Sequence, residues 1–226
     1  MTHRMFHGYA CHGKGKQSAQ PTARLLLAVL LGLALLPAMS LANIGKNSCS
    51  IGQDVCTDNT GDIKNNSCNG DFACFENAGA VGNNACVGEG ACVRNTGDIK
   101  NNSCNGASAC DDNGLTPGAT IGNNSCNGDV ACLKNGGHVG NNSCIGDNAC
   151  NNNFPQVTVG NNSCVGERAC FVNGGDVGNN SCVGDHACGG NRGTIGNNSC
   201  NAANACTGNT QPIGNNQCNT PNACST

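Results

Sequence analysis

The chain has 226 residues and a formal net charge of −3, and its composition excludes an ordinary globular core. Aromatic residues make up only 3% of it and tryptophan is absent, whereas 21 residues are cysteine. Cysteine usage this high indicates either metal ligation or a disulfide framework. No pattern typical of a catalytic site is present, so we do not expect an enzyme.

The N-terminal segment is typical of a secretory signal peptide. Residues 1–24 carry four basic residues and no acidic one, and an apolar run from Leu25 to Leu36 follows. Small residues up to Ala42 then have the spacing of a cleavage site. We therefore predict a signal peptide at residues 1–42 and a mature chain at 43–226. The alternative is an uncleaved anchor, because the apolar stretch reaches the lower limit for spanning a bilayer.

Removal of the signal peptide leaves an even number of cysteines and an acidic chain. Only Cys11 is lost, and the remaining twenty cysteines suit a disulfide framework. All fourteen acidic residues remain but only seven of the eleven basic ones, so the net charge is near −7. This charge disfavours nucleic acid and anionic membranes as partners. Export also favours oxidised cysteines over zinc ligation, and we expect a secreted or cell-surface protein without membrane contact beyond its signal peptide.

The cysteines define a repeat of about eighteen residues that occurs ten times. The second cysteine follows the first by six residues, except in the first repeat, where the separation is seven. Residues 121–138 read Ile-Gly-Asn-Asn-Ser-Cys, Asn-Gly-Asp-Val-Ala-Cys and Leu-Lys-Asn-Gly-Gly-His, which divides the repeat into three segments. Three short extended segments make a natural closed coil. The pattern therefore predicts an all-β fold, a parallel β-solenoid of about ten coils with its handedness left open.

Two kinds of position are expected to form the interior of each coil. The first residue of every repeat is Ile or Val, from Ile44 to Ile213. The residues that follow the cysteines vary freely in polarity and should face solvent. Because side chains alternate along a strand, these outward neighbours place the cysteines inside. The predicted interior is one Ile or Val and two cysteines per coil.

The predicted apolar core is small, whereas ordering the chain costs about 1.5 kcal/mol of free energy per residue. Disulfide bonds are therefore needed to stabilise the fold. Pairing within a coil is favoured, since each coil contains both partners and an intervening glycine can turn the chain. Pairing between stacked coils is the alternative, because neighbouring strands about 4.8 Å apart are within bridging distance. The predicted disulfide cysteines are Cys49, Cys56, Cys68, Cys74, Cys86, Cys92, Cys104, Cys110, Cys126, Cys132, Cys144, Cys150, Cys164, Cys170, Cys182, Cys188, Cys200, Cys206, Cys218 and Cys224.

Asparagine recurs at two positions of the repeat. One is the fourth residue, from Asn47 to Asn216, and the other lies three residues after the second cysteine, from Asn59 to Asn209. One interpretation is a polar binding face. The other, which we favour, is structural, because asparagine tolerates left-handed corners and can stack as a hydrogen-bonded ladder.

An acidic column lies three residues after the first cysteine in four successive repeats. Stacked carboxylates about 4.8 Å apart repel one another, so a divalent cation or a cationic surface would suit them. We expect no cofactor, and Ca²⁺ is the cation to test. The alternative is a solubilising face that discourages sheet stacking. The candidate metal ligands are Asp129, Asp147, Glu167 and Asp185.

Two insertions lengthen the third segment, at residues 115–118 in the fourth repeat and 154–157 in the sixth. Because both lengthen the same segment, we expect them on one edge of the stack, about 10 Å apart. Loops on a rigid scaffold often bind partners. Leu115 and Phe154 are therefore candidate binding residues, and the alternative is corner decoration without a function.

The segment Ile-Gly-Asn-Asn-Ser-Cys resembles the hexapeptide repeat of left-handed β-helix acyltransferases. This resemblance covers two segments of each coil and fails in the third, and the catalytic histidine of those enzymes has no counterpart. The cysteine spacing resembles that of beetle antifreeze solenoids, whose shorter coils carry a bridge between cysteines six apart. Their flat array of threonine pairs is missing from this sequence. Together the resemblances imply a cysteine-rich parallel β-solenoid.

We expect a structural or adhesive repeat protein without catalytic activity, with an unknown extracellular partner. The alternative is a cation-, mineral- or ice-binding surface protein. Solenoids usually need capping elements, and none is visible here. Ile44 follows the cleavage site at once, and the sequence stops two residues after Cys224. Exposed strand edges at the ends predict end-to-end self-association.

Overall fold

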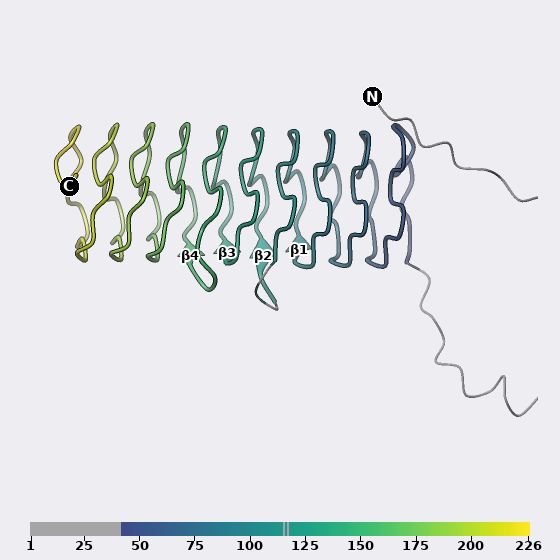
Figure 1. Ribbon diagram of the computed structural model, residues 1–226, viewed down its shortest axis with the longest axis horizontal. Helices are drawn as coiled ribbons and strands as arrows, with labels where there is room; N and C mark the ends of the chain where they lie inside the picture. Colours follow the sequence, from purple (N-terminus) through teal and green to yellow (C-terminus); the bar gives the residue numbers. More distant parts are fainter. Residues whose placement is uncertain (1–41, 115, 117) are drawn as a thin grey trace, which may run out of the picture. The chain divides into compact units, whose positions relative to one another are not determined.

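The computed structural model describes residues 42–114, 116 and 118–226, which form a succession of coils lying side by side (Figure 1). Apart from Ala42, the predicted signal peptide lies outside the described residues. The secondary structure of the described part consists of strands, turns and bends. In that part, no helix is long and apolar enough to cross a membrane.

Four two-residue strands form one parallel sheet in the order β1-β2-β3-β4. They are β1 (Asp98–Ile99), β2 (Thr120–Ile121), β3 (His138–Val139) and β4 (Thr158–Val159). Isolated parallel bridges continue the pairing on both sides of this sheet. The predicted column of Ile and Val is therefore in register through all ten repeats, from Ile44 to Ile213.

Left-handed backbone conformations keep the strands short. The asparagine at the fourth position and the first cysteine of the repeat both have φ between 51° and 58° in all ten coils. Asparagine tolerates this region, as the sequence analysis expected. A cysteine there costs about 1–2 kcal/mol, and its left-handed conformation was not predicted from the sequence.

Ten disulfide bonds each join the two cysteines of one coil, from Cys49–Cys56 to Cys218–Cys224. The bonded Cα atoms lie 5.4–5.8 Å apart, which is the ordinary range for a disulfide. From Cys68 to Cys206 every cysteine is fully buried. This is the within-coil pairing that the spacing favoured.

The interior holds more kinds of side chain than the sequence analysis predicted. The Ile and Val column is buried from Ile63 to Ile195. An alanine before the second cysteine and a serine or alanine before the first are also buried, as are the asparagines three residues after the second. The predicted interior of one aliphatic residue and two cysteines is therefore incomplete. Small residues stand beside the sulfur atoms because the disulfide fills the centre of a narrow coil.

Buried serines connect most coils to the next, and in the third coil Ala85 takes their position. The Ser143 hydroxyl donates to the Gly160 carbonyl oxygen at 2.7 Å and accepts the Ser163 backbone N–H at 3.1 Å. The same pair of bonds recurs wherever the column holds serine, from Ser67 to Ser199. The hydroxyls thus satisfy backbone groups that would otherwise be buried without a partner.

A second interior column is an asparagine ladder. Asn95 Nδ2 donates to Asn77 Oδ1 at 2.8 Å and to the Gly97 carbonyl oxygen at 2.7 Å. Side-chain bonds of this kind link the asparagines from Asn59 to Asn135, and again from Asn173 to Asn209. The structural interpretation of this position is therefore correct, and the ladder is interrupted at Asn153.

Removal of one central disulfide should destabilise the stack. The double substitution Cys126→Ala with Cys132→Ala should lower the free energy of unfolding by about 2–2.5 kcal/mol, the chain-entropy value for a loop of this size. Chemical denaturation of the oxidised protein measures the change. A peptide map of the single variant Cys126→Ala checks the pairing: Cys132 should carry a free thiol, and a bond from Cys132 to a neighbouring coil would contradict it.

Loss of one buried serine hydroxyl should also destabilise the stack. Ser143→Ala leaves a buried carbonyl and a buried N–H without partners, which costs about 1–3 kcal/mol. Ser108→Ala is the matched control, because this half-buried side chain makes no hydrogen bond in the described structure, and the change should stay within about 0.5 kcal/mol. Equal losses in the two variants, measured by denaturation, would contradict the role of the serine column.

Candidate binding sites

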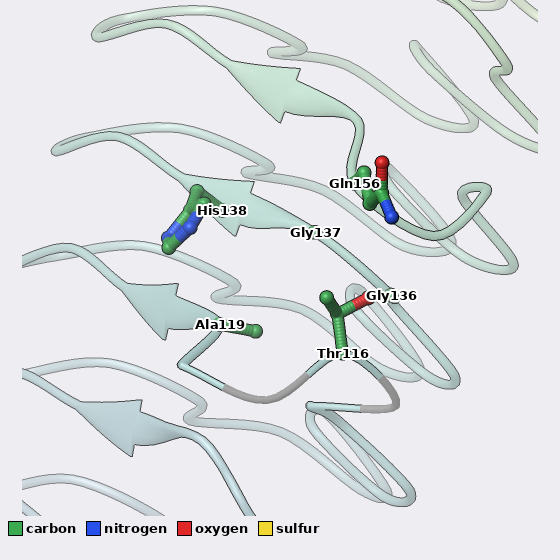
Figure 2. A pocket seen from close by; sticks show the side chains of 6 residues that line it. All are labelled: Thr116, Ala119, Gly136, Gly137, His138 and Gln156. Atoms are coloured by element: carbon green, nitrogen blue, oxygen red, sulfur yellow. The ribbon is translucent and has the colours of Figure 1, made fainter.

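A pocket of about 180 Å³ lies between the two insertions (Figure 2). Figure 2 shows Thr116 of the first insertion and Gln156 of the second on opposite sides of Gly136 and Gly137. The pocket exists because the fourth and sixth coils are lengthened in the third segment while the fifth is not. Both insertions therefore lie on one edge, as expected. The lining residues are Thr116, Ala119, Gly136, Gly137, His138 and Gln156.

The floor of the pocket is bare backbone. A Cβ added to Gly137 would lie 1.8 Å from the Val157 carbonyl oxygen, and one added to Gly136 would lie 2.8 Å from Pro155 Cα. The second insertion thus packs directly on these glycines, and neither position has room for a side chain. His138 Nδ1 lies 3.1 Å from Thr120 Oγ1. In Figure 2 the His138 ring lies beside the strands, away from Gln156.

Three buried side-chain atoms have no hydrogen-bond partner in the described part of the chain, and all three belong to these coils. They are Thr116 Oγ1, Asn135 Oδ1 and Asn153 Nδ2. Thr116 lines the pocket, and Asn135 directly precedes its glycine floor. Asn135 and Asn153 are also the neighbours at which the interior ladder breaks, since Asn153 Oδ1 accepts the Asn173 backbone N–H instead. Buried polar atoms are nearly always paired, so the insertions interrupt the regular hydrogen bonding of the interior at this point.

Of the two binding residues predicted in the insertions, the structure describes Phe154. Phe154 is 43% exposed, and its ring would lie 3.1 Å from a Cβ added to Gly174, so it covers the backbone of the next coil. Leu115 lies outside the described residues. Among the described residues of the insertions, Thr116 and Gln156 line the pocket, and the sequence analysis did not single them out. The one feature of the sequence that could have indicated these two residues is that both lie inside the insertions.

Three of the four residues in the acidic column, all but Glu167, accept a backbone N–H of the preceding coil. Asp147 Oδ1 accepts the Asp129 backbone N–H, and Asp185 Oδ1 accepts that of Glu167, both at 3.0 Å. Asp129 Oδ1 makes the same contact with Ala107 at 2.9 Å. Among the described residues, the sets of three potential metal ligands within 4.8 Å of one another consist of disulfide-bonded cysteines. The column therefore has a structural role that the sequence analysis missed, and its cation binding stays a prediction.

Substitutions at Asp147 separate these two roles. Asp147→Asn keeps an acceptor oxygen for the Asp129 N–H and should change the free energy of unfolding by less than about 0.5 kcal/mol. Asp147→Ala removes the acceptor and should cost about 1 kcal/mol. Calorimetric titration with CaCl₂ tests the cation. Saturable binding that Asp147→Asn abolishes would establish a calcium site, whereas a stability loss in Asp147→Ala without calcium binding would assign the column to structure alone.

An ion-pair cluster joins the third and fourth coils at the surface. Arg94 Nε lies 2.7 Å from Asp112 Oδ1, and Arg94 Nη2 lies 3.2 Å from Asp111 Oδ1. The hydrogen bond from Arg94 lowers the pKa of Asp112 and raises the pKa of Arg94 itself, while burial raises the pKa of Asp111. Arg94 therefore links the third coil to the fourth through contacts between charged side chains.

Two asparagine rows follow one corner of the stack, at the third and fourth positions of the repeat. In the third-position row, each Oδ1 accepts the backbone N–H of the preceding coil, as between Asn141 and Asn123 at 2.8 Å. The fourth-position row has side-chain bonds such as Asn142 Nδ2 to Asn162 Oδ1 at 3.3 Å. The third-position row comprises Asn65, Asn83, Asn101, Asn123, Asn141, Asn161, Asn179, Asn197 and Asn215.

Comparison with known proteins yields one family. A family model described as a domain of unknown function (DUF7640) matches residues 36–116, 115–158 and 153–226, which is more than half of the chain. The matched ranges meet at 115–116 and 153–158, where the two insertions lie, so the insertions interrupt the register of the shared repeat. No curated protein and no solved structure matches the chain.

Proposed function

We propose that this chain, which belongs to the DUF7640 family, is a structural or adhesive protein without catalytic activity, built as a parallel β-solenoid. The family description gives no function. The proposal therefore rests on the contacts that join the coils and on the surface positions that repeat along them. The proposed site of action is outside the cell or on its surface.

The observation that carries this proposal is the continuity of the contacts between coils. Parallel pairing runs from Ile44 to Ile213, and serine hydroxyls link successive coils from Ser67 to Ser199 except at the third coil, where Ala85 takes this position. Each coil also contains its own disulfide bond. A scaffold with these repeated restraints is stiff, and it presents equivalent surface positions at regular intervals. Such a scaffold suits mechanical support or repeated weak contacts.

The proposed location follows from cysteine chemistry. Disulfide bonds persist in oxidising compartments and are rare in the cytosol. Ten of them in one chain, most fully buried, fit folding during or after export. The basic, apolar and small segments within residues 1–42 fit the same route.

Localisation and adhesion together test the proposal. Antibody staining of intact, unpermeabilised cells should label the protein, and N-terminal sequencing of the exported form should begin at Asn43. Cells lacking the protein should lose attachment to their natural surface, and purified oxidised protein should restore it. Cytosolic protein with alkylatable cysteines, or unchanged attachment after its removal, would overturn the proposal.

A deletion variant tests whether the insertions are responsible for adhesion. Deletion of residues 115–118 and 155–156 restores the eighteen-residue period and removes both walls of the pocket. If the pocket holds the partner, this variant should fold, keep ten disulfides and fail to restore attachment. Full restoration would place adhesion on the repeated surface instead.

A further inference from the structure

The tenth coil differs from the others on its outer edge, the side that faces away from the ninth coil (Figure 1). In each of the first nine coils, the residue after the Ile or Val donates its backbone N–H to the coil that follows. Gly178 N–H donates to the Ile195 carbonyl oxygen and Gly196 N–H to that of Ile213, both at 2.8 Å. An unmodified outer edge would present the same donors unpaired, and such an edge pairs readily with a further strand.

Gln217 covers the first of these donors. In the other coils its position holds serine, or Ala85 in the third coil, and the serine hydroxyl bonds to the coil that follows. In the tenth coil the Gly214 N–H instead donates to Gln217 Oε1 at 3.0 Å.

The Gln217 side chain also occupies space on this edge. A Cβ added to Gly196 would lie 2.6 Å from the backbone carbon of Gly214 in the next coil, whereas one added to Gly214 would lie 3.2 Å from Gln217 Nε2. The amide of Gln217 therefore fills the space in which the backbone of a further coil would pack.

Two prolines remove other donors from the same edge. At the position of Pro212, the Thr158 N–H donates to Asp176 Oδ1 of the next coil at 2.8 Å. Pro221 stands in the acidic column, where the Glu167 N–H donates to a carboxylate of the next coil at 3.0 Å. Proline has no backbone N–H. Within residues 43–226 the other prolines lie in the two insertions, so both prolines of the regular repeat fall on this edge.

The first coil is modified at the third position of the repeat, where it has the exposed residue Lys46. The other nine coils have asparagine there, and its Oδ1 accepts a backbone N–H of the preceding coil, as Asn215 Oδ1 does for Asn197 at 2.7 Å. Lysine offers donors and no acceptor. A second copy stacked head to tail would place Lys46 where the Asn215 N–H needs an acceptor, and a charge at this place opposes strand pairing.

We propose that the first and tenth coils are end caps, which prevent copies of the chain from stacking head to tail and keep the mature protein monomeric. The end-to-end association expected from the sequence assumed unmodified strand edges, and Lys46, Pro212, Gln217 and Pro221 modify them. Without caps, in-register coils would stack without limit, because a head-to-tail contact of this kind does not close. The inference rests on the contacts between coils and is independent of the proposed adhesive function.

The mass of the oxidised mature protein, residues 43–226, tests the proposal directly. Sedimentation velocity and light scattering over a range of concentrations should both give the mass of a single chain throughout. Oligomers or fibres that grow with concentration would overturn the proposal. This measurement needs no substitution, so it decides the question even if a variant fails to fold.

A variant with the residues of the inner coils at both edges tests the cause. Pro212→Thr, Gln217→Ser, Pro221→Asp and Lys46→Asn each introduce a residue that other coils have at the same position. They supply two N–H groups, a hydroxyl and an acceptor, and they free the Gly214 N–H. The weight-average mass should therefore rise about twofold or more with concentration, as an open head-to-tail contact requires. A folded variant with ten disulfide bonds that remains a single chain would overturn the proposal.

A control variant makes similar exchanges away from the two edges. Pro155→Thr changes a proline of the second insertion, and Lys134→Asn removes an exposed charge from the fifth coil. Lys134 has a φ of 53°, a left-handed conformation that asparagine tolerates. The control should keep the mass of a single chain. Equal association of both variants would overturn the assignment of the caps to the terminal coils.

Discussion

Each coil closes around one disulfide bond, and the positions of most other groups follow from it. Because the bonded Cα atoms lie only 5.4–5.8 Å apart, the coil is narrow and admits small side chains beside the sulfur atoms. This restriction accounts for the buried alanine and serine columns. In every coil the first cysteine also has a left-handed backbone conformation. That conformation costs about 1–2 kcal/mol per residue, and the covalent bond and the hydrogen bonds around it offset the cost.

A narrow coil has little apolar area, so cohesion between coils depends on hydrogen bonds repeated at equivalent positions. Serine and asparagine columns provide them inside, and aspartate and asparagine columns provide them outside. Each bond contributes only about 0.5–1.5 kcal/mol, but the set recurs along the stack. Against this regular background the insertion region stands apart, because Thr116, Asn135 and Asn153 carry unpaired buried atoms there. The described structure thus contains two kinds of candidate binding site, a repeated surface and a single pocket.

The sequence predicted those features that depend on spacing within one repeat. Cysteine pairing, the Ile and Val column and the interior asparagine ladder all have a fixed position in an eighteen-residue period, so their recurrence was visible without coordinates. The buried serine was harder to identify, because a small polar side chain is usually exposed, and only its bonds to the next coil explain its burial. The role of Asp147 was missed for a related reason, since its partner is a backbone N–H of another coil. The pocket could not be predicted, because it requires the relative positions of Thr116 and Gln156, forty residues apart.

The in-register stacking has a consequence for the gene. The regular links between coils recur at the same positions of the repeat, and each disulfide bond is complete within one repeat. A repeat added or removed by unequal recombination would therefore find its own cysteine partner and both neighbouring ladders without any compensating substitution. Length can change in whole coils at little structural cost. Shorter insertions of two and four residues occur in the third segment, and the one in the sixth coil coincides with a broken ladder at Asn153. Copy number, more than point substitution, then sets the length of the stack and the number of equivalent surface positions that it presents.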